Sequence, residues 1–437
     1  MNIVAFVPAK GHSERIAAKN MSVLDGEHLF KRKLRQALDC PEIGEVCLDT
    51  ECDSLAAVAD DLPVSRLSRP SELASNATDG HEMFAWECAQ RPDADLWVQC
   101  LCTAPFVSAD TIGRAIRALL ADPEADSLVA VSRAKQYCWD EEAPLYGRGR
   151  IPNSVDLPPT IVEAMSLYIV RRTANGVPTR RFGTKPILFD LDPIEQIDIN
   201  HASDLVIAET VAAGQRAAEV TRFRAILPHL SSTILADICK DRGIRAVLPP
   251  SLRPTSGGKL LGRARTLELA ALPAPEQRAP DAWKGIYDAL QSYRFVRPGD
   301  VIMVATDVPD RAYFGDLNAN LAIRSGAVGA VIDGNTRDSA DVRALGFPVY
   351  ARHSHCDDIK YEGTVKSMNR PISMGGVAVA NGDVVFADED GVIVVPQHRW
   401  AEVEGLAWDS LANEARIRLF AARGRDVNEI LAECGAF

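Results

Sequence analysis

The chain has 437 residues, of which 47% are hydrophobic and 25% are charged, and its formal net charge is −12. This is the composition of an ordinary globular protein, and its length exceeds what one hydrophobic core usually supports, so we expect two domains. The acidic balance argues against nucleic acid as a partner, because a phosphate-binding surface normally needs an excess of Lys and Arg.

Targeting and redox signals are weak. The apolar run at the N-terminus is too short for a signal peptide, and no later stretch approaches the roughly 18 uninterrupted apolar residues of a membrane span. The 10 cysteines are spread over the length without paired CxxC spacing, so we interpret them, including Cys100 and Cys102, as reduced and mostly buried thiols. We therefore expect a cytoplasmic protein that binds no membrane.

The first half alternates strand-like and helix-like segments. The strand-like segments are 3–9, 45–50, 96–101 and 127–132, and the helix-like segments are 28–38, 53–61 and 111–121. This alternation predicts a parallel sheet covered by helices on both faces. Ligands of such sheets bind beyond the C-terminal ends of the strands.

The second half begins within a helical stretch from 203 to 242, and we place the domain boundary there, giving domains 1–218 and 219–437. Strand-like 300–306, helix-like 319–326, strand-like 327–333 and a cluster of short strands at 375–396 follow. The last 40 or so residues read as one long helix with Gly424 as a break or cap.

The loop after the first strand has the composition of a phosphate site. Small residues allow backbone N–H groups to approach a phosphate, and nearby cations supply charge for a triphosphate. The small residues are Ala9, Gly11 and Ser13, and the cations are Lys10, Arg15 and Lys19. Taken alone, such a loop is a solvated turn about as often as a nucleotide site.

Further motifs make the signal specific. VPAKGHSERIAAKN at 7–20 is followed by RP at 69–70, QCLCTAPF at 99–106, DLPP at 156–159 and DIN at 198–200. In this order the motifs resemble those of the CMP-sugar cytidylyltransferases, the acylneuraminate- and Kdo-activating family. The resemblance implies a Rossmann-like (GT-A-like) nucleotidyltransferase domain with a parallel-rich sheet, which transfers CMP from CTP to a 2-oxo sugar acid.

The same resemblance implies roles for individual residues. Asp198 would bind the catalytic Mg²⁺ (or Mn²⁺), Arg15 and Lys19 would act on the phosphates during catalysis, and Glu163 would contact the sugar acid. Asn20 and Gln99 would contact the nucleoside. The full expected nucleotide-binding set is Ala9, Lys10, Gly11, Ser13, Arg15, Lys19, Asn20, Arg69 and Gln99.

Three positions depart from the family pattern. Lys10 replaces the usual Arg, which keeps the charge but loses a bidentate fork. Asn200 stands where many members have a second Asp, and Ser154 and Val155 replace an Arg-Gln pair near the sugar, so an unusual acceptor is plausible. The alternative is a degenerate nucleotide-binding scaffold.

The second half carries FGDLN at 314–318 and VIDGNTRD at 331–338. Asp316 and Asp338 are carboxylates near glycines at strand–helix junctions, which suits a hard cation, and Arg337 is suited to hold a 2-oxo acid and stabilise an enolate. An isolated Arg-Asp pair is usually an ordinary surface salt bridge.

The spacing of these residues favours a site. The D-x20-R-D arrangement and GDVVFADEDGVIVVP at 382–396 look like the RraA-like family, which includes the metal-dependent 4-hydroxy-4-methyl-2-oxoglutarate aldolases, over about 225–430. The resemblance implies an α/β/α domain that forms trimers or hexamers. It implies that Asp338 binds Mg²⁺ or Mn²⁺, that Arg337 neutralises the enolate and that Asp316 orients Arg337. The N–H groups of Leu317 and Asn318 would bind the substrate carboxylate, and Glu414 of a neighbouring subunit would complete the second shell of the metal.

Alternatives to the enzyme remain within this family, since some members are non-catalytic regulators. Such members often lack the metal aspartate, so the presence of Asp338 favours an aldolase or decarboxylase. A pure oligomerisation scaffold is a further alternative. We interpret the acidic run 388–390 as a turn between strands, and His353 and His355 as part of a surface loop, rather than as metal ligands.

The expected partners are therefore small molecules: CTP, a 2-oxo sugar acid and a pyruvate-like 2-oxo acid. Aldol addition of pyruvate to an aldehyde gives a 4-hydroxy-2-oxo acid, which in a long enough sugar chain closes into a 3-deoxy-2-ulosonic acid. We therefore expect the second domain to make, trim or recycle the acid that the first domain activates.

Overall fold

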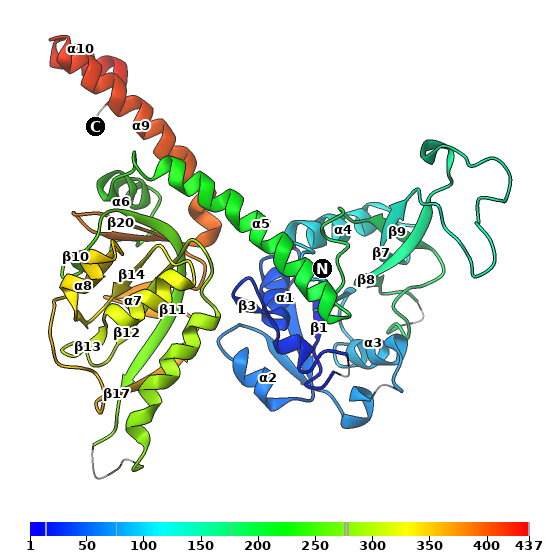
Figure 1. Cartoon of the computed structure of the whole chain (residues 1–437). Coiled ribbons are helices and arrows are strands. Elements are labelled where there is room, and N and C mark those ends of the chain that lie inside the picture. Colours follow the sequence, from blue (N-terminus) through cyan, green and yellow to red (C-terminus); the bar gives the residue numbers. More distant parts are fainter. Residues whose placement is uncertain (14, 76, 175, 275–276, 278, 436–437) are drawn as a thin grey trace. The chain divides into compact units, whose positions relative to one another are not determined.

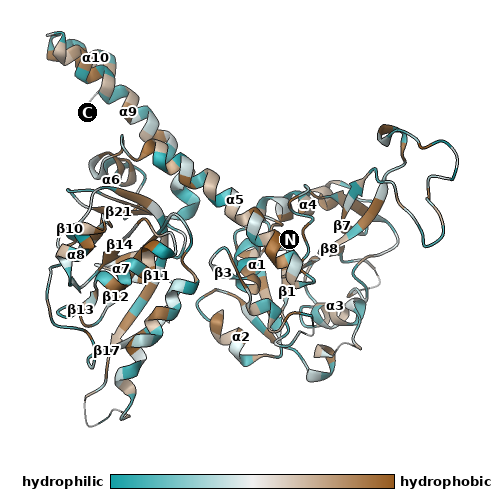
Figure 2. Ribbon diagram, viewed as in Figure 1, coloured by the Kyte–Doolittle hydropathy of each residue, from teal (hydrophilic) through white to brown (hydrophobic). Residues whose placement is uncertain are grey.

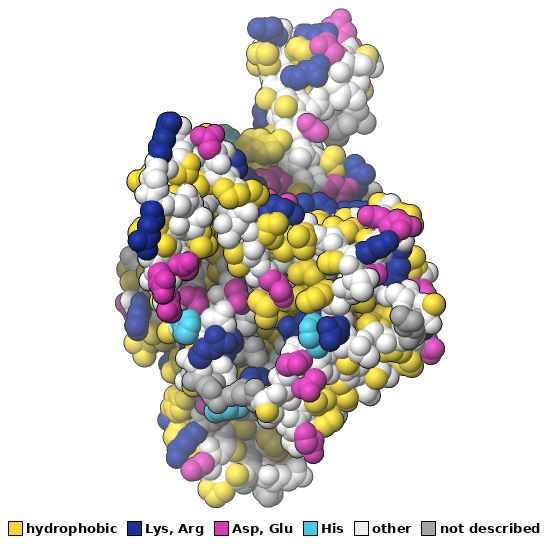
Figure 3. Space-filling model, turned by 90° about the vertical axis from the view of Figure 1, so that its right-hand side faces the viewer, with side chains coloured by type: hydrophobic (Ala, Val, Ile, Leu, Met, Phe, Trp, Pro, Cys, Tyr) yellow, Lys and Arg dark blue, Asp and Glu magenta, His cyan; other side chains and the backbone are white. Residues whose placement is uncertain are grey.

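The computed structural model describes residues 1–437 except 14, 76, 175, 275–276, 278 and 436–437 (Figure 1). The chain forms two compact units, Met1–Ala212 (the N-terminal unit) and Ala213–Phe437 (the C-terminal unit). Among the helices of the described residues, none combines the length and the hydropathy that crossing a bilayer requires. On the face shown in Figure 3, basic and acidic side chains lie interspersed.

The N-terminal unit is built on a seven-stranded sheet with the order β5-β4-β1-β6-β8-β7-β9. Its strands are β1 (Ile3–Pro8), β4 (Glu45–Thr50), β5 (Ser65–Ser68), β6 (Leu96–Cys100), β7 (Ser127–Ala134), β8 (Thr160–Arg171) and β9 (Pro186–Asp190). Neighbouring strands are parallel, except that β8 runs antiparallel to both β6 and β7. The predicted parallel-rich α/β fold is confirmed, and β8 is an addition that the sequence pattern did not indicate.

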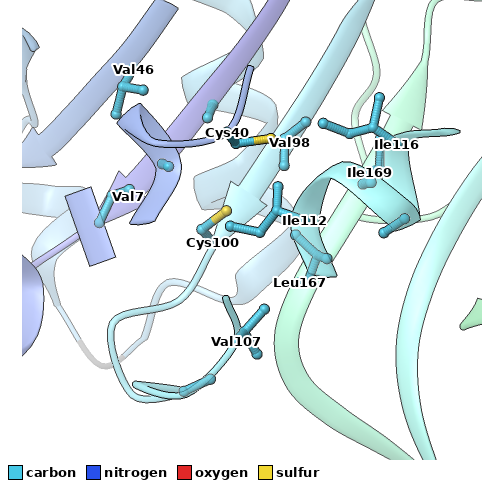
Figure 4. Packing of buried hydrophobic residues seen from close by; sticks show 14 of the residues in the cluster. Val7, Cys40, Val46, Val98, Cys100, Val107, Ile112, Ile116, Leu167 and Ile169 are labelled. Atoms are coloured by element: carbon cyan, nitrogen blue, oxygen red, sulfur yellow. The ribbon is translucent and has the colours of Figure 1, made fainter. Parts of the chain in front are cut away.

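Helices cover both faces of this sheet because side chains alternate along each strand. Ala5 and Val7 of β1 pack in the cluster formed with α1 (Leu29–Leu38) and α4 (Ala109–Ala121), part of which Figure 4 shows. Val4 and Phe6 point to the other face and pack with α3 (Gly80–Ala89). Apolar residues accordingly concentrate on the strands and on the inner faces of these helices (Figure 2).

Shorter elements and one long helix complete the N-terminal unit. They are η1 (Lys19–Met21), β2 (Val23–Leu24), β3 (Glu27–His28), α2 (Asp53–Val58), η2 (Ser71–Ala74), η3 (Ser154–Asp156) and the start of α5 (Ala202–Ile226). Ala208 and Ala212 of α5 belong to a core cluster of the N-terminal unit, whereas Phe223 and Ile226 belong to a cluster of the C-terminal unit. The helix thus contributes packing to both units.

The C-terminal unit has an eight-stranded sheet with the order β10-β16-β14-β12-β11-β20-β21, and β17 also pairs with β11. The strands are β10 (Arg253–Ser256), β11 (Leu260–Ala271), β12 (Asp300–Thr306), β14 (Gly329–Ile332), β16 (Val349–Ala351), β17 (Gly363–Met368), β20 (Val384–Ala387) and β21 (Val392–Val395). β11, β12, β14 and β16 are parallel, and β17, β20 and β21 join antiparallel.

The two faces of this sheet are covered differently. Ile302 and Val304 of β12 pack in a cluster with η5 (Ala282–Arg294), α7 (Asp316–Arg324) and α8 (Ser339–Ala344). Val301 and Met303 face a cluster that contains the hairpin of β18 (Ile372–Met374) and β19 (Val377–Val379). The domain is mixed α/β, as expected, but a hairpin replaces helices on this part of the second face.

The end of the chain matches its prediction in outline. α6 (Ser232–Asp241) and α9 (Trp400–Ala422) pack with β20 and β21, and η6 (Gln397–Arg399) leads into α9. Gly424, with a φ of 71°, separates α9 from α10 (Val427–Cys434), so the predicted break in the terminal helix is confirmed.

Candidate functional sites

A cavity of about 330 Å³, here called the N-terminal cavity, lies at the C-terminal ends of β1 and β6. Pro8 ends β1, and Leu101 and Cys102 follow directly after β6. The predicted site residues that line the cavity are Lys10, Arg15, Lys19, Asn20, Arg69 and Asp198, together with the departing position Asn200. The structure thus gathers side chains that are 190 positions apart in the chain (Lys10 and Asn200) around one cavity, as expected for an α/β sheet.

Lys19 and Asp198 form the most polar part of this cavity. Lys19 is buried, its Nζ donates to the carbonyl oxygen of Ile199 at 3.0 Å, and burial and then repulsion from Arg15 lower the pKa of its ammonium. Asn200 donates its side-chain amide to Oδ2 of Asp198. Oδ1 of Asp198 is buried and has no hydrogen-bond partner.

An unpartnered, buried carboxylate oxygen is unfavourable unless something supplies positive charge. Divalent cations such as Mg²⁺ take hard oxygen ligands, and Mg²⁺ is usually held by one or two carboxylates with substrate phosphates and water. Asp198, with Asn200 as its hydrogen-bond partner, therefore fits the metal that the family resemblance implies.

The backbone of the predicted phosphate loop is less available than expected. Ala9 is fully buried and its N–H donates to the carbonyl oxygen of Asp49 at 2.9 Å. The N–H of Gly11 donates to Oε1 of Glu51 at 2.7 Å. Ala9, Gly11 and Ser13 are absent from the cavity lining, so the loop presents its cations rather than these N–H groups.

Gln99 and Arg69 belong to a buried network that runs through Glu87 and Asp49, and Arg69 also lines the cavity. Gln99 is fully buried, donates its amide to Glu87 and is not among the residues that line the cavity, so its contact with the nucleoside stays a prediction. Arg69 pairs with Asp49 at 2.5 Å. Burial, and then the neighbouring charge of Asp49, raise the pKa of the Glu87 carboxyl.

Met165 and Arg181 are two lining residues that the sequence motifs did not single out. Met165, in β8, has a φ of 47°, and Arg181 lies between β8 and β9. Glu163, the expected substrate contact, is exposed and accepts a hydrogen bond from the hydroxyl of Tyr168. The ring of Tyr168 lies against Arg181, so Glu163 is connected to the cavity through these two residues.

In the C-terminal unit, the pairing of β13 (Ala312–Phe314) with β15 (Asn335–Thr336) brings two helix N-termini together. α7 begins at Asp316, and Asp338 is the N-cap of α8. The backbone N–H of Asp316 approaches Oδ2 of Asp338 at 3.4 Å. Asp338 has a φ of 53°, a left-handed conformation that is strained for a residue with a side chain and that often marks a functional position.

Arg337 is oriented by a residue that the sequence did not single out. Its Nη1 lies 2.6 Å from Oδ2 of Asp358, and its Nε lies 3.6 Å from Oδ2 of Asp338. The expected orienting residue was Asp316, but Asp358 supplies the close carboxylate. The isolated bridge between Ala312 and Asp358 explains how a distant loop reaches the site.

The N-terminus of α7 suits a carboxylate. The first N–H groups of a helix have no partner within the helix, and the positive end of the helix dipole adds attraction for an anion. Leu317 and Asn318 lie in this first turn, and the Leu317 side chain is exposed. The side-chain amide of Asn318 donates to the backbone carbonyl oxygen of Tyr313 at 2.9 Å. The hydroxyl of Tyr293 donates to the backbone carbonyl oxygen of Asn318 at 3.0 Å, so Asn318 is held in place.

The metal ligands of this second site are sparse. Within the described residues, no group of three or more His, Cys, Asp or Glu side chains is arranged to hold a metal. Asp338 alone, with water completing the shell, is compatible with Mg²⁺. Glu414 lies on α9 and pairs with Arg418. His353 and His355 are exposed, and the backbone of their segment forms hydrogen bonds with the backbone of Thr336.

The fold and the two sites define a protein with a cytidylyltransferase-like unit and an aldolase-like unit. The Cytidylyltransferase family model matches residues 4–143, and the Aldolase/RraA model matches residues 232–394. A protein of Halalkalibacterium halodurans named "Putative 4-hydroxy-4-methyl-2-oxoglutarate aldolase" is 32% identical over 180 residues, which cover 41% of this chain and 76% of that protein. The chain therefore belongs to the RraA-like family through its second half, and both predicted resemblances are confirmed.

Other similar proteins match one half of the chain at a time. Protein DlpA of Legionella pneumophila is 28% identical over 205 residues, covering 46% of this chain and 32% of DlpA, so the chain spans less than two thirds of that relative. The structure of RraAS2 from Streptomyces coelicolor matches with a TM-score of 0.37 and 29% identity, over 43% of this chain and 91% of RraAS2. A CMP:2-keto-3-deoxy-manno-octonic acid synthetase complexed with CTP matches with a TM-score of 0.32 and 13% identity, over 39% of this chain and 74% of the synthetase.

Proposed function

We propose that the N-terminal unit transfers CMP from CTP to a 3-deoxy-2-ulosonic (sialic- or Kdo-like) acid. The observation that carries this proposal is the buried, unpartnered Oδ1 of Asp198 in a cavity that Lys10, Arg15 and Lys19 also line. An acidic ligand position beside three cations suits a metal–triphosphate substrate better than a neutral one.

In this reaction the anomeric hydroxyl oxygen of the acid forms a bond to the α-phosphorus of CTP. The bond from that phosphorus to the bridging oxygen of the β-phosphate breaks, pyrophosphate leaves with the electron pair, and the hydroxyl proton is released. Lys10, Arg15 and Lys19 hold the phosphates in line and offset the charge that builds up on the leaving group. A divalent ion held by Asp198 and Asn200 would supply further positive charge to the phosphates.

The test is pyrophosphate release from CTP and Mg²⁺ with a panel of ulosonic acids, comparing the natural chain with Asp198→Asn. We expect release that depends on the acid and falls roughly 100-fold or more in the variant, the loss typical of removing a charge-stabilising group. Asp192→Asn is the matched control, because Asp192 is an exposed aspartate in the same segment. No release with any acid would end the proposal.

For the C-terminal unit we propose a divalent-metal pyruvate aldolase or 2-oxo acid decarboxylase. Its support is the convergence of Arg337, the strained Asp338 and the first turn of α7 at one place. In aldol cleavage the C4 hydroxyl loses its proton, the C3–C4 bond breaks and a carbonyl compound leaves. The electron pair stays on C3 of pyruvate enolate, which is then protonated. Loss of CO₂ from an oxaloacetate-like acid leaves the same carbanion.

The chain's own residues match these needs. The N–H groups of Leu317 and Asn318 would hold the substrate carboxylate, and the Arg337 guanidinium would offset the negative charge on the enolate oxygen. Asp358 keeps that guanidinium in place. A divalent ion at Asp338 would act as a Lewis acid toward the 2-oxo group. We also propose a trimer or hexamer, in which Glu414 of a neighbouring subunit joins the site.

Pyruvate release from 4-hydroxy-2-oxo acids and from oxaloacetate, with Mg²⁺ or Mn²⁺, tests this second activity. We expect Asp338→Ala to reduce it by roughly two to three orders of magnitude. Asp341→Ala is the control, since Asp341 is exposed on the same helix, α8. Wild-type protein without any release, or a variant with unchanged release, would leave the C-terminal unit as a scaffold or a protein-binding regulator.

A further inference from the structure

Arg181 is a buried cation in the N-terminal cavity that the motifs above do not explain. It lines the cavity, and only 8% of the residue is exposed. Its guanidinium carbon lies 4.9 Å from the centre of the Tyr168 ring. Its Nε is buried and has no hydrogen-bond partner, and no carboxylate of the described residues lies within ion-pair distance of it.

The surrounding structure holds this arginine in one place. The backbone N–H of Arg181 donates to Nδ1 of His81 at 3.2 Å, and the neighbouring Phe182 packs edge-on against the His81 ring at 5.2 Å. Gly80 makes the room, because a Cβ at that position would lie 2.4 Å from Nη1 of Arg181. A guanidinium fixed by stacking and by close packing has little entropy left to lose on binding a ligand.

The other cations of the cavity already have roles. Lys10, Arg15 and Lys19 come from one segment beside Asp198 and suit the triphosphate. Arg69 is neutralised by Asp49 at 2.5 Å. Arg181 comes from a different segment, next to β8, and makes no ion pair with a carboxylate of the described residues, although its charge acts on Asp79, which also lines the cavity.

A second anion must enter this cavity if the proposed reaction occurs there, because the carboxylate of a 2-ulosonic acid is attached directly to its anomeric carbon. A planar guanidinium binds a carboxylate through two parallel hydrogen bonds, and such bonds are stronger in a buried setting than in water. Nε is one of the two donors that such a fork can use, and it is the atom without a partner.

We propose that Arg181 binds the carboxylate of the acceptor sugar acid and so selects acidic acceptors. This inference rests on the proposed cytidylyl transfer and adds a specificity residue to it. Tyr168 positions the guanidinium from one side, and the first turn of α3 positions it from another.

The test uses the full chain and separates the Michaelis constants for the two substrates. In Arg181→Ala we expect the KM for the acid to rise roughly 10- to 100-fold, the effect of losing a charged hydrogen-bonded pair, while the KM for CTP stays within about twofold. Arg181→Lys keeps the positive charge but cannot form two parallel hydrogen bonds. Its KM for the acid should therefore lie between the values for the natural chain and for Arg181→Ala. Arg180→Ala, at the exposed neighbouring position, is the control.

Three results decide between the outcomes. A carboxamide analogue of the acid should be a poor substrate for the natural chain and should lose little further in Arg181→Ala. An equal rise of the KM for CTP would place Arg181 on the nucleotide and overturn the inference, as would an unchanged KM for the acid. If the natural chain transfers CMP to no acid at all, the proposed function itself fails, which is a different result from an active enzyme that ignores the Arg181 substitution.

Discussion

At the scale of single residues, Gly315 and Asp338 depend on each other. A Cβ at position 315 would lie 2.4 Å from Oδ2 of Asp338 and 3.1 Å from Cγ of Arg337. Asp338 cannot easily retreat, because its backbone already occupies the left-handed region at a φ of 53°. The missing side chain of Gly315 therefore sets the position of the carboxylate that we propose as the metal ligand.

We expect Gly315→Ala to keep the fold but to displace this carboxylate. The affinity for Mn²⁺, measured by calorimetry or by paramagnetic relaxation of water, should fall roughly 10- to 100-fold, as it does when groups that orient a metal ligand are lost. Gly391→Ala is the matched control, because nothing lies within 4 Å of a Cβ there. Equal Mn²⁺ affinity in both variants would contradict the role of Gly315.

The residues of the N-terminal cavity show which parts of a site a sequence can predict. Lys19 and Asp198 follow strand ends within recognisable motifs, so their meeting could be anticipated. Arg181 and Asp358 lie in irregular segments with no periodicity, and only the three-dimensional path of the chain brings them in. Gln99 was expected to contact the nucleoside, but its strand is covered on both faces: Gln99 shares a face with Trp97, which packs in the α3 cluster, and its amide is bonded to Glu87.

At the scale of elements, β1, β4, β6, β7, β12 and β14 were predicted because each is a short, largely apolar run near a helix-like segment, whereas the parallel strands β5, β9, β11 and β16 were not predicted. β8 was not predicted either, since its 12 residues pair with β6 and β7 through contacts that lie far apart in the chain. Strand propensity depends strongly on such cross-strand neighbours. The same strand carries Met165, which lines the cavity, and Tyr168, whose ring lies against Arg181.

Helix α1 carries a lysine on its buried face, which the hydrophobic periodicity of the helix does not explain. Lys33 is 1% exposed, and its Nζ donates to the carbonyl oxygen of Val107 at 3.0 Å. Burial lowers the pKa of Lys33 from 10.5 to about 8, with the thiols of Cys100 and Cys102 and the carboxylate of Glu195 acting in the opposite direction. The charged form of this lysine therefore destabilises the fold.

This gives a pH dependence with a defined sign. Between about pH 8 and pH 10.5 the unfolded chain binds the Lys33 proton and the folded chain does not, so the free energy of unfolding of the natural chain gains about 1.4 kcal/mol per pH unit from this group. The unfolding free energy of Lys33→Met should therefore exceed that of the natural chain by the most below pH 8. This difference should shrink as the pH rises. Urea unfolding at pH values on both sides of 8 measures this difference.

A control isolates the effect of burial. Lys240→Met, at an exposed position in α6, should show the same pH dependence as the natural chain. If the difference in unfolding free energy between the natural chain and Lys33→Met stayed constant across this pH range, Lys33 would not be losing its proton early in the folded state.

At the scale of the whole molecule, each proposed site draws its described residues from one unit. The N-terminal cavity is lined by residues between Pro8 and Asn200, whereas Arg337, Asp338 and Asp358 all belong to the C-terminal unit. A substitution in one site should therefore leave the other site intact. The chemistry nevertheless connects them, because pyruvate addition to a sugar aldehyde produces the class of acid that cytidylyl transfer consumes.

We therefore predict that two inactive variants will complement each other. Asp198→Asn should retain pyruvate chemistry and Asp338→Ala should retain CMP transfer, each within about twofold of the natural chain, as expected for sites that share no residues or interaction partners. With pyruvate, a sugar aldehyde, CTP and Mg²⁺, neither variant alone should form a CMP-linked acid, and an equimolar mixture should form it. Anion-exchange chromatography detects the product. If the natural chain forms this product but the mixture does not, the acid is passed within one assembly rather than released, and the two sites are not independent.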